Sequence, residues 1–145
     1  MMAVYSGNPL YKKLGIKQNQ EICVINQPAD YIEWLQEVPK GVVFRKLEEV
    51  IQVPFIHLFC ENESELHNLL PIIKPKMEIH GAIWVSWIKK ASKNYAWTIT
   101  DLDVRNLGLH LGLVDVKVCA VSEDWSGLKF MYRLEDRKKM KANQM

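Results

Sequence analysis

Short apolar runs alternate with amphipathic and polar stretches along the whole chain, a pattern typical of a sheet whose strands are connected by helices. Four such runs, 21–26, 42–45, 55–60 and 82–85, are rich in β-branched and aromatic residues and are bounded by Pro, Gly, Asn or charged residues. The run 82–85 is apolar throughout, so we expect it to be a central strand buried on both faces.

The segments between these runs have helical spacing. Tyr31, Trp34 and Leu35 follow an i, i+3, i+4 pattern, which predicts a short amphipathic helix. Asn62 is placed to cap a second helix that begins at residue 63, with a break or kink expected near Pro71. A third helix is predicted from residue 101, after a capping box formed by Thr100 and Asp103.

The C-terminal third predicts a different arrangement. The segments 115–122 and 128–134 alternate between apolar and polar residues, and Ser126-Gly127 between them predicts the turn of an antiparallel hairpin. We expect residues 1–20 to be an irregular lead-in and 135–145 to be a frayed basic tail. The order of elements predicts one α/β domain over 1–145, with three layers: a mostly parallel Rossmann-like sheet, ending in the antiparallel hairpin, and helices on both of its faces.

Composition narrows the class of protein. The chain has 145 residues, of which 48% are hydrophobic and 25% charged, and its formal net charge is +2. No apolar run approaches the length that spans a bilayer, so we expect no membrane association and a cytoplasmic location. The small net charge does not favour a nucleic-acid partner. Cys23, Cys60 and Cys119 each lie in apolar runs without metal-ligand spacing and are expected to be buried, reduced thiols.

Several segments resemble a known family. Residues 11–16, 84–87 with 89–90, 116–121 and 125–128 are similar to an uncharacterised bacterial family known as domain of unknown function 3052, whose pattern has a proline where this chain has Ile88. From residue 74 through the hairpin, the chain is also similar to the back half of Rossmann-like, adenosylmethionine-dependent methyltransferases. The resemblance implies a truncated methyltransferase-like Rossmann fold and supplies no activity.

The cofactor motifs of that fold are missing from the sequence. A methyltransferase needs a glycine-rich turn after its first strand, and residues 26–30 read Asn-Gln-Pro-Ala-Asp here. In a methyltransferase an acid at the end of the second strand holds the ribose hydroxyls of the cofactor. That position is occupied by Arg45 here. Adenosylmethionine is therefore disfavoured and no cofactor is predicted. The four histidines have no metal-ligand spacing, so no metal is expected and His57 is interpreted as structural. No catalytic residue is predicted.

A candidate site follows from the position of the strand ends, because ligands of open α/β sheets bind beyond the carboxyl ends of the strands. The candidate ligand-binding residues are Asn26, Glu61, Ser86, Trp87, Lys89 and Lys90. Two ammonium groups beside hydroxyls and a flat ring predict a small anionic ligand or a nucleotide. The alternative is a solvated lysine pair on a loop, with Trp87 half buried as a packing residue. Trp125 is expected either to cap the core or to reach the same rim.

Two functions therefore remain open from the sequence. The first is a non-catalytic binding or partner-interaction module, with a homodimer or a protein partner, that keeps the methyltransferase scaffold without its cofactor loop. The second is a small-ligand or nucleotide-binding enzyme, a degenerate methyltransferase, with a pocket at the strand carboxyl ends. Nucleic-acid binding through Lys89, Lys90 and the basic tail is a weaker third hypothesis.

Overall fold

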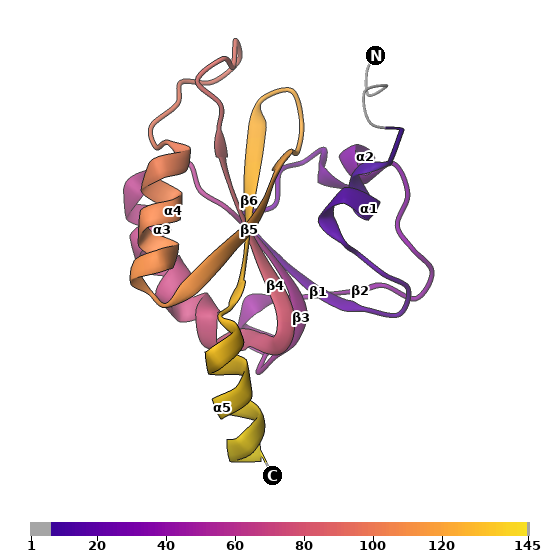
Figure 1. Cartoon of the computed structure of the whole chain (residues 1–145). Coiled ribbons are helices and arrows are strands. Elements are labelled where there is room, and N and C mark those ends of the chain that lie inside the picture. The colour runs from indigo at the N-terminus through magenta and orange to yellow at the C-terminus, as the bar shows by residue number, and fades with distance from the viewer. Residues whose placement is uncertain (1–6, 145) are drawn as a thin grey trace.

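The computed structural model describes residues 7–144 and contains one twisted sheet (Figure 1). Its strands are β1 (Glu21–Ile25), β2 (Val43–Arg45), β3 (Val53–Phe59), β4 (Met77–Ile88), β5 (Leu113–Ala120) and β6 (Trp125–Tyr132). They form a 6-stranded sheet in the order β2-β1-β3-β4-β6-β5. The first four strands are parallel to one another, and β6 runs antiparallel to both β4 and β5. This confirms the predicted mostly parallel sheet with a C-terminal antiparallel pair.

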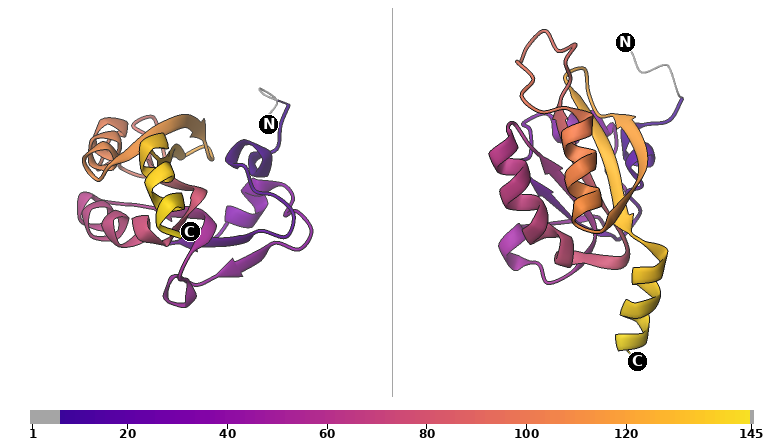
Figure 2. Two further views of the ribbon diagram at one scale, coloured as in Figure 1. Left: turned by 60° about the horizontal axis from the view of Figure 1, so that its bottom comes forward. Right: turned by 60° about the vertical axis from the view of Figure 1, so that its left-hand side comes forward.

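Helices cover both faces of the sheet. They are α1 (Leu10–Leu14), α2 (Tyr31–Leu35), α3 (Glu63–Ile73), α4 (Asp101–His110) and α5 (Leu134–Gln144), with 3-10 turns η1 (Leu47–Glu49) and η2 (Lys74–Lys76). Figure 2 shows α3 and α4 together on one side of the sheet and α1 and α2 on the other. Each side has its own apolar core, with Leu66 and Val104 in the first and Leu14 and Tyr31 in the second. The predicted three-layer α/β fold is therefore confirmed.

The strand β4 lies at the centre of the sheet. It begins at Met77, ahead of the predicted run 82–85, because Glu78 and His80 already alternate with buried residues in the first part of the strand. Further along, β4 is covered on both faces by the two cores. The fully buried Trp84 donates from its indole Nε1 to the carbonyl of Leu14 at 2.9 Å, which ties the segment after α1 to the sheet.

The hairpin turn lies four residues earlier than predicted. The chain reverses between Ala120 and Trp125, and Ser126-Gly127 lies inside β6, paired with β4. A Cβ on Gly127 would lie 3.1 Å from the Ser86 hydroxyl oxygen and 3.1 Å from Val121. A side chain here would be tight against its neighbours, so the glycine suits the close packing of β6 on β4 and does not mark a turn.

The C-terminal segment differs from the prediction. Residues 135–145 were expected to fray, yet α5 continues to Gln144. The segment is rich in strong helix formers, and Glu135 and Asp136 lie in its first turn, where acids favour the helix dipole. Arg137 donates to the carbonyl of Tyr132 at 2.9 Å and Met140 packs against the core. Figure 1 shows that the rest of α5 extends away from the sheet.

Other predicted boundaries compare as follows. The lead-in contains α1, and its first six positions lie outside the described residues. The helix α3 continues through Pro71 to Ile73 without the expected break. The capping box of Thr100 and Asp103 at the start of α4 is confirmed, with reciprocal hydrogen bonds of 3.3 and 2.9 Å.

Within residues 7–144, no helix has the length and apolar character needed to cross a membrane.

The contact between α4 and β6 gives a first testable prediction. Gly108 faces Phe130, which is fully buried, and a Cβ at this position would overlap the Phe130 ring. We expect Gly108→Ala to lower the free energy of unfolding by about 1–3 kcal/mol, although alanine is the better helix former. Urea denaturation measures the change. In a Phe130→Leu background the same alanine should be tolerated far better; an equal loss in both backgrounds would contradict the packing explanation.

Candidate pocket at the topological switch point

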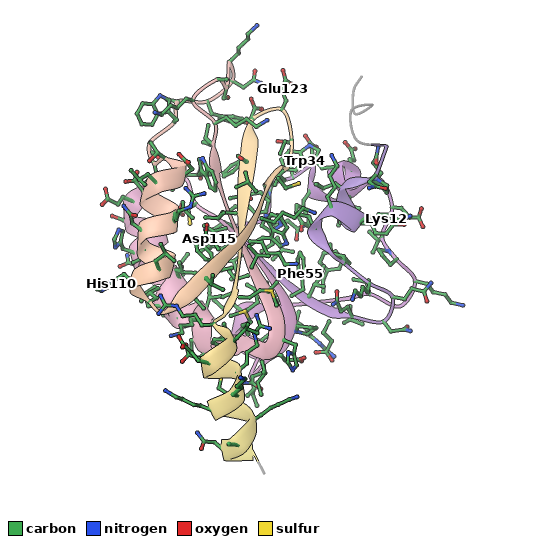
Figure 3. The ribbon with its side chains drawn as sticks, in the orientation of Figure 1. Lys12, Trp34, Phe55, His110, Asp115 and Glu123 are labelled. Carbon is green, nitrogen blue, oxygen red and sulfur yellow. The ribbon has the colours of Figure 1, made fainter. Side chains whose placement is uncertain are left out.

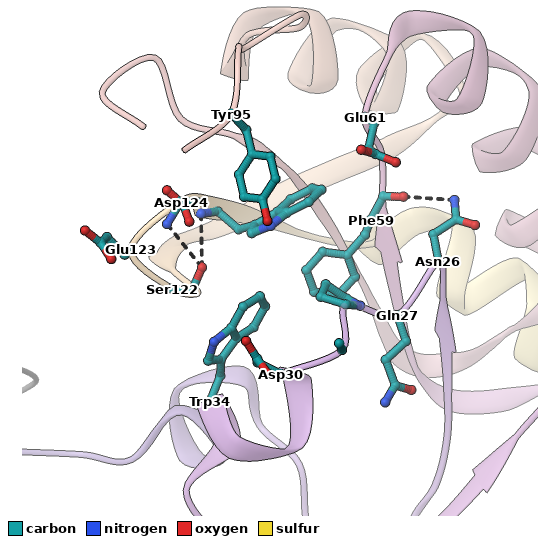
Figure 4. Close-up of a pocket in the computed structure, with 13 residues that line it drawn as sticks. Asn26, Gln27, Asp30, Trp34, Phe59, Glu61, Tyr95, Ser122, Glu123 and Asp124 are labelled. Atoms are coloured by element: carbon teal, nitrogen blue, oxygen red, sulfur yellow. Dashed lines mark hydrogen bonds between the residues drawn. The ribbon is translucent and has the colours of Figure 1, made fainter. Parts of the chain in front are cut away.

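The order in which successive strands are added to the sheet reverses at β1. It passes from β1 to β2 on one side and then returns to place β3 on the other side of β1. The loops that leave the carboxyl ends of β1 and β3 therefore diverge, and such a switch point is where open α/β sheets bind ligands. A pocket of about 450 Å³ lies at this position (Figure 4).

Two sequence-predicted residues line this pocket, and both are held by the ends of the strands. Asn26 follows β1 with a φ of 58°, in the left-handed region that asparagine tolerates. Its side-chain amide donates to the carbonyl of Phe59 at 3.0 Å and to Glu65 at 3.4 Å. The backbone N–H of Glu61 donates to the other Glu65 oxygen at 2.7 Å. These bonds fix the ends of β1 and β3 against α3, which Asn62 caps as predicted.

The charged groups of the pocket are all acidic. The lining includes Asp30, Glu61, Glu123 and Asp124, and contains no lysine or arginine. Figure 3 shows Glu123 near the hairpin turn, at the same end of the sheet as Trp34. Among residues 7–144, the carboxylates of Asp30, Glu61 and Glu123 have no ion-pair partner. The pocket therefore has a negative potential, which attracts cations and repels anions.

The carboxylate of Asp124 has a structural role at the rim. It accepts hydrogen bonds from the Ser92 hydroxyl at 2.8 Å and from the Asn94 amide at 3.1 Å. The Asp124 carbonyl also accepts from the N–H of Lys89 at 2.8 Å. These bonds join the loop after β4 to the hairpin turn, so Tyr95 on that loop is held at the pocket.

Four aromatic residues contribute to the lining. Phe59 lies at the base, and its ring centroid is 5.1 Å from that of Trp125 and 6.5 Å from that of Trp34. Tyr95 completes the set from the loop after β4, as Figure 4 shows. Trp125 is buried in the core and also lines this pocket, which contains none of Ser86, Trp87, Lys89 and Lys90. Sequence reasoning did not identify Trp34, Phe59 or Tyr95 as pocket residues.

The structure does not bring Ser86, Trp87, Lys89 and Lys90 into this pocket. Ser86 is fully buried and Trp87 is 6% exposed, because β4 continues to Ile88 and is paired with β6 along this part. Neither lysine lines the pocket, and the ammonium of Lys90 instead lies 5.0 Å from the centre of the Trp97 ring. Of the six predicted residues, only Asn26 and Glu61 line the pocket.

A buried hydrogen-bonded chain lies behind the pocket. The Nδ1 of His57 lies 2.8 Å from the Tyr31 hydroxyl, and its Nε2 lies 2.8 Å from the Ser86 hydroxyl. All three side chains are fully buried. Burial lowers the pKa of His57 to about 3 and raises the pKa of Tyr31, so the imidazole is neutral. A neutral imidazole offers one donor and one acceptor, which satisfies both hydroxyls. His57 is therefore structural, as expected from its strand.

The usual contacts to a nucleotide cofactor are not provided here. The turn after β1 contains Pro28, which has no N–H to donate, and α2 is only 5 residues long. Arg45 at the end of β2 pairs with Glu21 at 3.3 Å instead of presenting an acid to a ribose. The described residues contain no group of three or more His, Cys, Asp or Glu placed to hold a metal ion.

Comparisons with known proteins identify the class of fold and do not identify a family. No family model matches the chain and no curated protein matches its sequence, so the likeness to domain of unknown function 3052 stays a prediction. A SAM-dependent methyltransferase from Aquifex aeolicus is similar in structure, with a TM-score of 0.61 and 14% identity over 86% of this chain and 88% of that one. The pyocyanin biosynthetic protein PhzM gives 0.62 and 8% identity, over 86% of this chain and 53% of PhzM.

A third similar structure is the B. subtilis M1A22 tRNA methyltransferase TrmK, with a TM-score of 0.54 and 11% identity over 89% of this chain and 67% of TrmK. At these identities the likeness shows the fold alone. The chain therefore has the Rossmann-like fold of SAM-dependent methyltransferases, with an acidic, aromatic-walled pocket at its switch point.

Proposed function

We propose that this protein is a non-catalytic binding module that uses the methyltransferase scaffold to hold a small cationic ligand in the switch-point pocket. The observation that carries the proposal is the charge of the lining, which has four carboxylates and no lysine or arginine. A positive ligand gains Coulomb energy from each carboxylate, while an anion is repelled by all of them. The acidic lining argues against the small anionic ligand expected from the sequence.

The groups that line the pocket support binding over catalysis. The lining contains no histidine, cysteine or lysine. The hydroxyl of Ser122 accepts hydrogen bonds from the N–H groups of Asp124 and Trp125, both at 3.2 Å, and so stabilises the hairpin turn. No residue of the lining has the hydrogen-bonded base that activates a nucleophile. The enzyme hypothesis therefore has less support than the binding module.

Adenosylmethionine is the natural second candidate, because structurally similar proteins bind it. LepI is described in complex with SAM, and it covers 87% of this chain with a TM-score of 0.52. The sulfonium of SAM suits an acidic pocket. The proline-containing turn after β1 and Arg45 at the end of β2 remove the usual contacts to its remaining groups. We expect SAM to bind more weakly than a smaller cation.

Two further expectations belong to this proposal. Val116 and Val118 are exposed on β5, which is an edge strand, and this supports the homodimer or protein partner expected from the sequence. Burial of the Cys23, Cys60 and Cys119 side chains supports the expected cytoplasmic location.

Probes matched in shape and opposite in charge test the proposed function. Thermal melting is measured with tryptamine, which is cationic, and with indole-3-propionate, which is anionic. At about 100-fold excess over its dissociation constant, tryptamine should raise the melting temperature by roughly 5 °C or more, and indole-3-propionate should leave it unchanged. Equal effects of the two probes, or no effect of either, would contradict the proposal.

Charge variants locate the binding. Asp30→Asn and Glu61→Gln should each weaken tryptamine binding by about threefold to tenfold, since each removes one carboxylate from the lining. Glu135→Gln is the matched control, because it removes the same charge from α5, far from the pocket. If the control weakens binding as much as the pocket variants, the effect is due to net charge and the pocket is not the site.

A further inference from the structure

We infer that the ligand of the switch-point pocket carries a quaternary, methylated ammonium group. We place it in an aromatic box in which Trp34 and Tyr95 face the group and the largely buried Phe59 and Trp125 form the base. This inference rests on the proposed function and narrows it to one class of cation. It depends on three observations: the orientation of the rings, the absence of a cation of the protein itself beside them, and the bonds that fix two of the walls.

The four rings come from four separate parts of the chain. Trp34 lies on α2, Phe59 ends β3, Trp125 begins β6, and Tyr95 lies on the loop between β4 and α4. The plane of Phe59 makes an angle of 81° with that of Trp125 and 47° with that of Trp34. The walls therefore lie in different planes around the space that Figure 4 shows, instead of forming one stack.

The faces of aromatic rings attract cations through their quadrupoles. In the described part of the chain, the only cation over a ring is Lys90, which lies over Trp97 outside the pocket. No lysine or arginine lines the box itself. Phe59 is 1% exposed and stacks on His57, and Trp125 is 8% exposed, so the ring faces available to a cation from a ligand are those of Trp34 and Tyr95. The unpaired carboxylates of Asp30, Glu61 and Glu123 add attraction at longer range.

The ring faces of Trp34 and Tyr95 favour methylated over primary ammonium groups. A primary ammonium has three N–H donors and loses strong hydration when it enters a site. A ring face supplies no lone-pair acceptor to replace that water. A trimethylammonium has no N–H donor, so it loses little and its methyl groups pack on the rings. The pocket, at about 450 Å³, has room for a substituent beyond this head group.

Two of the walls are fixed relative to each other. The N–H of Tyr95 donates to the Ser92 hydroxyl at 3.1 Å, and that hydroxyl donates to Asp124 at 2.8 Å. Asp124 precedes Trp125 directly, and the N–H of Trp125 donates to the Ser122 hydroxyl. The backbones of Tyr95 and Trp125 are therefore joined through a short chain of hydrogen bonds, which restricts the loop that presents the Tyr95 ring before a ligand arrives.

Isothermal titration calorimetry with three probes tests the inference. N,N,N-trimethyltryptamine should bind about tenfold more tightly than tryptamine, since cation–π contacts of a weakly hydrated cation replace a costly desolvation. Choline should bind, and 3,3-dimethyl-1-butanol, its neutral analogue of the same shape, should not. Equal affinity of the two tryptamines overturns this inference and leaves the proposed function standing. If no cation binds, both fail.

A matched pair of aromatic variants tests the box itself. Tyr95 is 55% exposed and Trp97 is 46% exposed on the same loop, so either can be replaced without opening the core. Tyr95→Leu should weaken binding of trimethyltryptamine by about fivefold or more, and Trp97→Leu should leave it unchanged. Trp34→Leu should act like Tyr95→Leu. Unchanged binding in Tyr95→Leu, or an equal loss in Trp97→Leu, would rule out the box.

Discussion

Replacing His57 by leucine should lower the free energy of unfolding by about 2–6 kcal/mol. The change preserves much of the volume of the side chain but leaves the hydroxyls of Tyr31 and Ser86 buried without partners. Each unsatisfied buried polar group costs about 1–3 kcal/mol. Within residues 7–144, every buried side-chain polar atom has a hydrogen-bond partner, so this loss would be unmatched elsewhere in the core. Urea denaturation followed by circular dichroism measures it.

A triple variant separates the hydrogen bonds from packing. Tyr31→Phe, His57→Leu and Ser86→Ala together remove all three polar groups, so no partner is orphaned. Replacing every member of such a set with apolar groups can be nearly neutral. We expect the triple variant to regain most of the stability that His57→Leu loses. A triple variant less stable than the single variant would contradict this explanation. The loss in His57→Leu would then come from altered packing and not from unpaired hydroxyls.

Stability should also fall steeply in mild acid. Burial lowers the pKa of His57 to about 3, whereas an unfolded chain protonates its histidine near 6.5. Between these values the unfolded state binds one proton more than the folded state, so the stabilisation is complete above pH 6.5 and is lost as the pH falls towards 3. The slope is about 1.4 kcal/mol per pH unit, and the whole window amounts to about 5 kcal/mol.

The same triple variant isolates this titration. It lacks the imidazole, so its free energy of unfolding should fall less between pH 6.5 and 4.5 than that of the unmodified protein. The difference between the two losses should be about 2–3 kcal/mol. The carboxylates are common to both proteins and cancel in the difference. Parallel pH profiles would mean that His57 is protonated as readily in the folded protein as in the unfolded chain.

The sequence predicted the fold well because periodicity records burial directly. The apolar run at 82–85 identified the central strand, and Thr100 with Asp103 identified the start of α4. The errors have local causes. Gly127 resembles a turn residue, but it lies inside β6, where Ser86 and Trp84 pack closely against it. The tail resembles a solvated segment, but its residues are good helix formers.

The site was only partly predictable, because its walls come from segments that are distant in the sequence. Position after a strand identified Asn26 and Glu61, which topology alone brings together. The same rule failed for Ser86, since β6 covers it from a segment about forty residues later. Nothing local in the sequence indicates that Tyr95 would be tied through Ser92 to the hairpin turn.

The buried chain of Tyr31, His57 and Ser86 also provides a signal that can be followed in solution. Its imidazole ring stacks on Phe59, with ring centroids 4.2 Å apart, and Phe59 is the base of the pocket. The imidazole N–H is hydrogen-bonded and shielded from water, so it exchanges slowly and resonates downfield of the amides in a proton NMR spectrum. A ligand that displaces Phe59 alters the ring current at that proton. Occupancy can thus be read from a single resonance, with no label on protein or ligand.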